Sequence, residues 1–376
     1  MNVGRLNACL CLIRGEYQAF EIIKKLKTLQ NSLQQSINQP SEEIAKNFQN
    51  NYSILFDALS ESWSNFEPPT RIKTFDDIEA SSKIGQGLRN RIEKIISDNN
   101  ITPASALKSL SELVDEIGKF YGAIDRVVND FEFLNFEYED LNPGEYEIGV
   151  SFPLKIIKSN LEGVSKETHE LDKVFKTFKE IAEDDTSSIK IRSISTTDFQ
   201  VFLDSVPVVA MLIVTSLERI VALYKNILEI RKIKNELVAK KMPKDVVTPL
   251  EKHEAEMMKI GIEKMSESLI DEFYKKKDDS RKNELKTALG IALRYLVGKI
   301  EHGAIFDVRA GEPEEPEPTE GEEETTQYKK VKSEYIKEME RIKQINSKGR
   351  SIAELQKGDI ALLLLKSKKK DSENKK

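Results

Sequence analysis

Residues 102–131 read TPASALKSLSELVDEIGKFYGAIDRVVNDF, and this stretch decides the fold class of the chain. Its apolar residues recur every three or four positions, the spacing that gathers them on one side of an α-helix. Thr102 is a favoured capping residue, and Pro103 suits the first helical position. We expect a helix of roughly 50 Å whose seam packs in a bundle or a coiled coil. The seam consists of Leu107, Leu110, Val114, Ile117, Tyr121, Ile124, Val128 and Phe131.

Shorter stripes with the same spacing precede this helix. They are formed by Ile22, Leu26, Leu29 and Leu33, by Ile44, Phe48, Tyr52, Leu55, Leu59 and Trp63, and by Ile84, Leu88, Ile92 and Ile95. Ser41 is a suitable cap for the second of them. Asn142-Pro143-Gly144 is expected to end the long helix, because proline and glycine disfavour a helix interior. The sequence therefore predicts an N-terminal helical region over residues 1–142.

The period of the pattern changes at residue 145. Tyr146, Ile148, Val150 and Phe152 alternate with polar or small residues, which indicates a half-buried strand. A helix with an apolar stripe follows, and then strand-like runs at residues 188–194 and 199–203. A lone strand would leave its edges unpaired. We therefore expect a small, mostly antiparallel β element of two to three strands within residues 143–206.

The C-terminal part returns to helical spacing and then becomes highly charged. Helices are expected over residues 207–241, 243–274 and about 281–302, in a helical bundle over residues 207–306. Residues 311–326 contain eight Glu and no Lys or Arg, and such runs favour a solvated linker. The sequence thus predicts an acidic linker at 307–327 and a disordered basic tail at 328–376, with a short helix near 330–345. The predicted fold class is mainly α, with long amphipathic helices around the small β element.

Composition places the chain in a reducing compartment. Apolar residues make up 39% of it, charged residues 32%, and the net charge is −6. The two cysteines, Cys9 and Cys11, do not make a disulfide framework, which favours a cytoplasmic location. The lysine- and isoleucine-rich composition leads us to expect a prokaryotic source.

Sequence motifs of enzyme chemistry are missing. The three histidines stand apart from one another and from the cysteines, so the sequence predicts no metal site. Gly85-Gln86-Gly87 lacks the third glycine and the preceding strand of a dinucleotide-binding loop. We expect no cofactor, and the missing motifs favour a non-enzymatic protein while leaving an enzyme as an open alternative.

The most apolar segment is Val206–Leu217, and it has two interpretations. It is bracketed by Asp204 and Glu218, so as a helix it would reach only about 20 Å into a hydrocarbon core about 30 Å thick. A buried core helix is the favoured interpretation, and a membrane contact is the alternative. The residues in question are Val208, Val209, Met211, Leu212, Ile213 and Leu217.

The same predicted helix continues with a second seam, in which apolar residues keep heptad spacing. This seam packs either against the chain's own helices or against a second copy. Its residues are Ile220, Leu223, Ile227, Ile230 and Leu237.

The densest cluster of small polar residues is an anion-site candidate. An arginine fork, hydroxyl groups and backbone N–H groups together can bind an anion. The alternative is an ordinary turn, which Ser, Thr and Asp also favour. The residues are Arg192, Ser195, Thr196, Thr197 and Asp198, with Asp204 nearby.

These features favour a non-enzymatic helical interaction or scaffold protein that binds a protein partner or itself. The first alternative is a membrane-associated or membrane-active protein that uses residues 206–217. The second is a ligand sensor or enzyme with a site near Arg192–Asp204. A nucleic-acid partner is not expected, because the basic tail lacks aromatic residues for base stacking.

Overall fold

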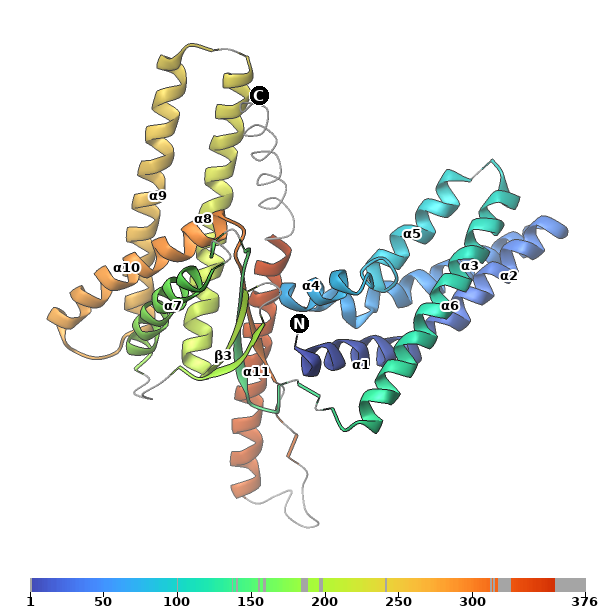
Figure 1. The fold of residues 1–376 in the computed structure, drawn as a ribbon, viewed down its shortest axis with the longest axis horizontal. Coiled ribbons are helices and arrows are strands. Elements are labelled where there is room, and N and C mark those ends of the chain that lie inside the picture. Colours follow the sequence, from blue (N-terminus) through green and yellow to red (C-terminus); the bar gives the residue numbers. More distant parts are fainter. Residues whose placement is uncertain are drawn as a thin grey trace. The chain divides into compact units, whose positions relative to one another are not determined.

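The computed structural model describes residues 2–99, 101–136, 138–139, 141–154, 156–157, 160–183, 189–195, 199–240, 242–311, 313, 315–316 and 326–355. The protein is mainly helical, at 75% helix, with a small antiparallel sheet. It divides into two compact units, Met1–Asp140 and Leu141–Lys376, which are described separately below (Figure 1). The predicted basic tail beyond residue 355 and most of the predicted acidic linker lie outside the described residues.

The N-terminal unit is built from helices alone among its described residues. They are α1 (Val3–Ala19), α2 (Ile22–Asn38), α3 (Glu42–Glu61), the 3-10 helix η1 (Trp63–Phe66), α4 (Pro69–Asp77), α5 (Gly85–Asp98) and α6 (Pro103–Phe133). Ser41 caps α3 by accepting a hydrogen bond from the Ile44 N–H, as expected. Thr102 occupies the capping position of α6, but its side chain makes no capping hydrogen bond.

The seam of α6 forms the spine of this unit's core. Leu110, Ile117 and Val128 are completely buried, while Leu107 and Phe131 at the two ends are partly buried. The helix packs along α1, α2 and α5. The sequence prediction of a long helix with one buried side is therefore confirmed.

The end of α6 differs from the sequence prediction. The helix stops at Phe133, well before Asn142-Pro143-Gly144. Leu134 closes it with a hydrogen bond from its N–H to the Asp130 carbonyl, and Asn135 follows with φ +55°. Asparagine tolerates this left-handed conformation better than most residues, so Asn135 ends the helix without proline or glycine.

The C-terminal unit contains a four-stranded sheet in the order β2-β3-β1-β4, with all neighbours antiparallel. The strands are β1 (Tyr146–Phe152), β2 (Ile191–Ser195), β3 (Phe199–Ser205) and β4 (Ile305–Ala310). The small antiparallel element is confirmed, but the expectation of two to three strands was wrong. The fourth strand lies where we expected the end of a helical region and the start of a linker, and its Phe306 and Val308 are buried.

Five helices complete this unit in the part of it that the structure describes. They are α7 (Leu161–Ile181), α8 (Pro207–Ala239), α9 (Lys244–Phe273), α10 (Asp279–Glu301) and α11 (Thr326–Leu355). The first four match the predicted helices closely. The last is longer than the predicted helix near 330–345. It packs against α8 and β4, and its Ile342 and Ile345 are completely buried in the core of this unit.

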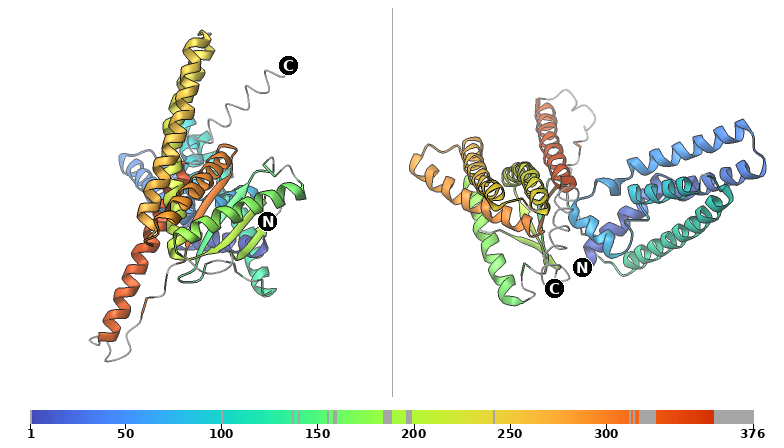
Figure 2. Two further views of the ribbon diagram at one scale, coloured as in Figure 1. Left: turned by 90° about the vertical axis from the view of Figure 1, so that its left-hand side faces the viewer. Right: turned by 90° about the horizontal axis from the view of Figure 1, so that it is seen from above.

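One hydrophobic core joins the sheet to these helices. The apolar side of β1, formed by Tyr146, Ile148, Val150 and Phe152, belongs to the same buried cluster as residues of α7, α8, α9 and α10. Figure 2 shows α8 and α9 as two long neighbouring helices that extend beyond the sheet of this unit. The sheet therefore anchors the N-terminal part of α8, and the C-terminal end of this helix leaves the core.

Candidate functional site

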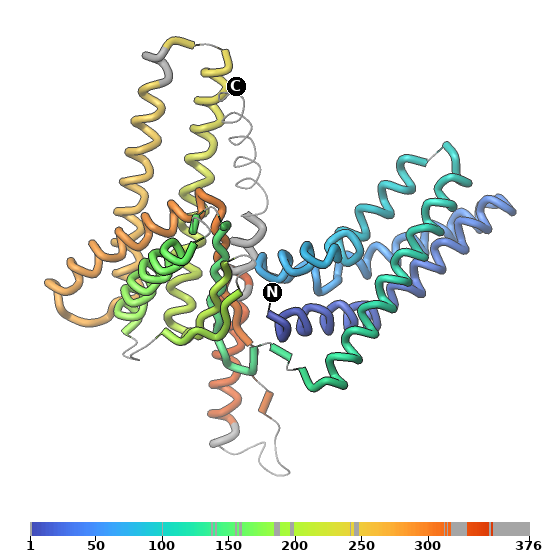
Figure 3. Tube along the Cα trace, viewed as in Figure 1, coloured from blue at the N-terminus to red at the C-terminus, as the bar shows by residue number. Residues whose placement is uncertain are grey.

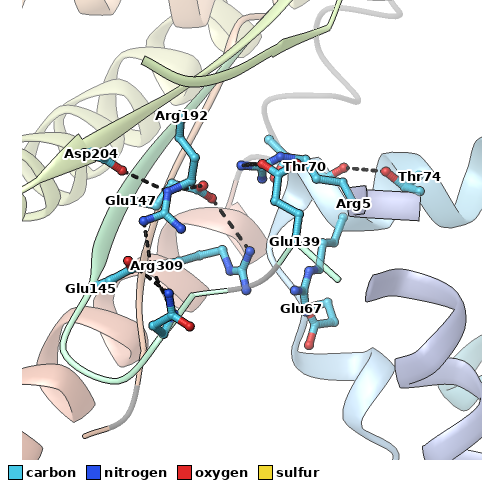
Figure 4. Close-up of polar contacts among 12 residues, drawn as sticks. Arg5, Glu67, Thr70, Thr74, Glu139, Glu145, Glu147, Arg192, Asp204 and Arg309 are labelled. Atoms are coloured by element: carbon cyan, nitrogen blue, oxygen red, sulfur yellow. Dashed lines mark hydrogen bonds and ion pairs between the residues drawn. The ribbon is translucent and has the colours of Figure 1, made fainter. Parts of the chain in front are cut away.

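Arg192, the centre of the predicted anion site, lies in an ion-pair cluster on the sheet of the C-terminal unit. Strand β2 shifts its register against β3 between Ile191 and Ser193, and Arg192 stands in this irregularity. Its Nε donates to Asp204 Oδ1 at 2.9 Å, and its Nη2 donates to Glu145 Oε2 at 2.7 Å (Figure 4). The guanidinium fork therefore faces carboxylates of its own unit.

Glu147 extends this cluster on the same side of the sheet. Its Oε2 lies 3.8 Å from Arg192 Nε, and its Oε1 lies 3.7 Å from Arg309 Nη1 on β4. Two arginines thus meet three carboxylates, from Glu145, Glu147 and Asp204. A cluster that already carries this many acidic groups is poorly suited to an added anion.

The ionisation of the cluster follows from these contacts. Burial raises the pKa of Glu145, but the hydrogen bonds from Arg192 and Asn142 lower it by more. The pKa therefore lies below its ordinary value. Burial works to lower the pKa of Arg192, and its bonds to Glu145 and Asp204 outweigh this, so the pKa is raised. Both groups are held in their charged forms, as expected of a structural ion pair.

Of the other predicted anion-site residues, Ser195 ends β2 opposite Gln200 and is buried. Thr196, Thr197 and Asp198 lie outside the described residues. Sequence reasoning missed the contributions of Glu145, Glu147 and Arg309. The strict alternation of β1 puts Glu145 and Glu147 on one side of the strand, but it does not reveal which arginine they meet.

A close approach between strands β1 and β4 lies next to this cluster. Gly149 faces Asp307 directly across the two strands, and a Cβ atom at Gly149 would overlap the Asp307 carboxylate. Glycine is therefore required at this position for Asp307 to lie across β1.

The apolar segment at the start of α8 lies mainly in the core. Val209, Leu212, Ile213 and Leu217 are buried, and Met211 packs against the same cluster. Val208 is 42% exposed. Among the described residues, α8 is the single helix long and apolar enough to span a membrane, and 61% of its most apolar window is buried within the protein. Core helices of soluble proteins share this composition, so the finding is weak evidence for a membrane span.

The second predicted seam of α8 packs against α9 within the same chain. Ile220 and Ile227 are completely buried, whereas Leu223, Ile230 and Leu237 are partly exposed. Leu223 lies against Gly261 of α9, where an added Cβ would come within 2.6 Å of the leucine Cδ1 atom. The two helices approach closely at this point because Gly261 has no side chain.

Arg231 marks the place where the α8–α9 hairpin leaves the core. Its Nε bonds Glu254 of α9, its Nη2 donates to Glu301 of α10 at 2.6 Å, and its Nη1 donates to the Tyr224 hydroxyl at 2.9 Å. Burial and the nearby Glu301 raise the pKa of Tyr224 to about 12. Arg231 thus fastens three helices together at the base of the hairpin.

Residues 232–253, which we call the distal arm, lie beyond Arg231. None of the arm side chains that the structure describes is buried. Three apolar side chains are markedly exposed: Ile233 at 53%, Val238 at 48% and Met242 at 42%. Figure 3 shows the C-terminal end of α8 extending away from the sheet and from α7 and α10. Pro249 lies inside the first turns of α9 and removes one backbone hydrogen bond there.

The N-terminal unit has a surface hollow of about 520 Å³ between α1, α2 and α6. Tyr17 and Tyr121 line it and contact each other, and the Tyr121 hydroxyl donates to the Ile13 carbonyl at 3.1 Å. Two lysines and two acidic residues of the lining balance in charge. Across the described part of the chain, no cluster of His, Cys, Asp or Glu has the arrangement of a metal site.

Comparison with known proteins gave no match to a family model, to a curated protein or to a solved structure. The candidate sites therefore rest on the geometry of this chain alone, and the distal arm is the strongest of them.

Proposed function

We propose that this chain is a non-enzymatic interaction protein and that the distal arm is its binding element. The observation that carries this proposal is the exposure of Ile233, Val238 and Met242 on a hairpin that leaves the core. A helix stretch without buried side chains gains little from packing. Covering the arm with a partner would bury these side chains and stabilise the hairpin.

Each exposed apolar side chain contributes about 1.5–3 kcal/mol when a partner buries it completely. The Arg231 contacts hold the base of the arm, so less conformational freedom remains to be lost on binding. A helix–helix association, in which a partner helix packs against the exposed side chains of the distal arm, is the geometry that we propose for a protein partner, including a second copy of the chain.

The other two functions receive less support. Burial of Leu212, Ile213 and Leu217 weighs against a membrane contact through residues 206–217. The bonds between Arg192 and its carboxylates weigh against an anion site at Arg192–Asp204.

The test is a double substitution in the arm, Ile233→Asp with Val238→Asp, compared with Leu161→Asp and Ile291→Asp in the same unit. The control residues are 87% and 60% exposed and lie on α7 and α10. Light scattering measures association with a second copy, and cross-linking in native lysate measures association with other proteins. The arm variant is expected to lose association that the control variant keeps. Equal behaviour of the two variants would contradict the proposal.

A further inference from the structure

The N-terminal unit buries a carboxyl group that has no cation beside it. Glu16 of α1 is only 1% exposed, and its Oε2 accepts a hydrogen bond of 2.7 Å from the Ser64 N–H in η1. Among the described residues, no lysine or arginine forms an ion pair with Glu16. An ionised carboxylate in such a place loses its hydration without gaining a compensating charge. The site therefore favours the protonated form of Glu16.

The groups on the elements that pack against α1 do not supply a positive charge to Glu16. The titratable groups that interact with it, or with its neighbour Tyr121, are acidic or phenolic: Tyr17, Tyr121, Asp125 and Glu67. The cations on the same elements are bound elsewhere: Arg14 to Glu132, Arg71 to Glu67, Lys24 to Glu21, and Lys25 to the Phe20 carbonyl. Burial raises the pKa of Glu16 and Glu67 raises it further, which the serine hydrogen bonds only partly offset.

The hydrogen bond from Ser64 to this carboxyl group ties η1 to α1. Ser62 and Ser64 are buried, whereas Trp63 between them is 45% exposed. The Trp63 ring lies edge-on to Phe20, with the ring centroids 5.7 Å apart. It also lies against Gly15, where an added Cβ would come within 3.2 Å of the indole ring. A 3-10 helix has poor hydrogen-bond geometry of its own, so the position of η1 depends on these few contacts.

We propose that Glu16 is a pH-dependent latch on η1: protonated Glu16 keeps η1 closed over α1, and ionised Glu16 releases it. The structure shows the closed state. Loss of the proton places a charge in a buried site, and opening of η1 lets water reach that charge. The closed state binds the proton more tightly than the open state. The latch is therefore complete below pH 4.5 and is lost as the pH rises through the raised pKa.

The opening is local, because the far end of η1 is held by contacts that do not titrate. Asn65 Nδ2 donates to the Leu59 carbonyl at 2.7 Å, and Asn65 Oδ1 accepts from the Gln86 N–H at 2.6 Å. Ionisation of Glu16 leaves these two bonds intact. The Trp63 side of η1 therefore moves away from α1 while α3 and α5 keep their positions. The latch lies wholly in the N-terminal unit and does not involve the distal arm.

Trp63 is the single tryptophan of the chain, so its fluorescence reports directly on η1. The test is a titration of the full chain from about pH 4 to about pH 8, with circular dichroism recorded in parallel. As the pH rises, Trp63 emission should shift to longer wavelength and become easier to quench with acrylamide. The midpoint should lie above pH 4.5, and the helix signal should stay constant. Glu16→Gln should keep η1 closed and show no transition.

Two further variants assign the transition to Glu16. Glu61→Gln is the matched control, because Glu61 is exposed and lies only two residues before Trp63; this variant should keep the wild-type transition. Glu67→Gln removes a negative charge that disfavours ionisation of Glu16, and it should move the midpoint to lower pH. A transition that persisted in Glu16→Gln, or one that disappeared in Glu61→Gln, would overturn the assignment to Glu16.

Hydrogen exchange of the Ser64 amide gives a second measurement that needs no variant. After correction for the intrinsic pH dependence of exchange, its protection should fall about tenfold per pH unit between pH 4.5 and the raised pKa of Glu16. The amide of Ile117 in α6 should keep its protection over the same range. Protection of Ser64 that did not change with pH would overturn the latch. A loss of helix signal together with the fluorescence change would also overturn it, because the whole unit would then be unfolding.

Discussion

Helices α6 and α8 have similar sequence patterns and different surroundings. Both carry apolar residues at heptad spacing over about thirty residues. The seam of α6 is buried from Leu110 to Val128. In the seam of α8, Ile220 and Ile227 are completely buried, whereas Ile230 and Leu237 are partly exposed. Periodicity therefore predicts which side of a helix is apolar, and the neighbouring elements decide how much of that side is buried. The uncovered C-terminal end of α8 is where we propose that the function lies.

The largest effect is expected in the buried parts of both seams. Ile117→Ala in α6 and Ile220→Ala in α8 each remove a completely buried side chain. Each should lower the free energy of unfolding of its own unit by about 2–5 kcal/mol, because a cavity remains. Urea denaturation followed by circular dichroism measures this. A loss below about 1 kcal/mol at either position would mean that the seam is not a packed core.

A smaller effect is expected at the base of the arm. Arg231→Ala leaves Glu254 and Glu301 without their shared partner and should cost roughly 1–2 kcal/mol, since the cluster is only half-buried. Arg231→Lys should restore part of the loss but cannot reproduce the fork geometry. Hydrogen exchange should report faster opening of the arm in the alanine variant. Unchanged exchange across residues 232–253 would show that Arg231 does not hold the arm.

The stability of the N-terminal unit should depend on pH through Glu16. Burial raises the pKa of Glu16 above 4.5, although hydrogen bonds from Ser64 and Ser62 counteract part of this. The folded state then binds the proton more tightly than the unfolded state, so this contribution to stability is complete below pH 4.5 and is lost as pH rises through the raised pKa.

Glu16→Gln should therefore flatten the melting temperature of the N-terminal unit between about pH 4 and about pH 8. The glutamine carbonyl can still accept the hydrogen bond from the Ser64 N–H, which Glu16 accepts at 2.7 Å. The variant should be relatively more stable at the upper end of the range. Parallel pH profiles for the variant and the wild-type protein would contradict the raised pKa.

The smallest effect is expected in the arm itself. Ile233→Ala should change the free energy of unfolding by no more than about 0.5 kcal/mol, because the side chain is already exposed and alanine favours helices. Ile220→Ala is the matched variant, because it removes the same residue type from a buried position on the same helix. A loss at Ile233 as large as that at Ile220 would mean that the arm is covered in the free protein.

The sequence predicted the helices and strands better than it predicted which of them pack or pair together. The long helices, β1 and the strands β2 and β3 follow from apolar periods of three to four or of two. Strand β4 was missed because its six residues include Asp307 and Arg309 and stand between a helix and a glutamate-rich run. Its pairing with β1 brings together residues more than 150 positions apart, and no local pattern carries that information.

The candidate sites show the same division. The sequence marked Arg192 as unusual, but Glu145 and Asp204, which engage it, come from two other segments and are brought near by strand pairing. The sequence also identified the α8 seam from Ile220 to Leu237. It did not show that Ile220 is buried by α9 and the core whereas Leu237 is partly exposed. Burial is a property of the assembled unit, so it could not be predicted from spacing alone.

Hydrogen exchange along α8 tests the central claim most directly. In the free protein, amides of residues 212–228 should be protected to near the level of global unfolding, and those of residues 232–240 should exchange through local opening at a much lower free energy. A monomeric protein in which both segments were equally protected would contradict the account, because the distal arm would then belong to the core.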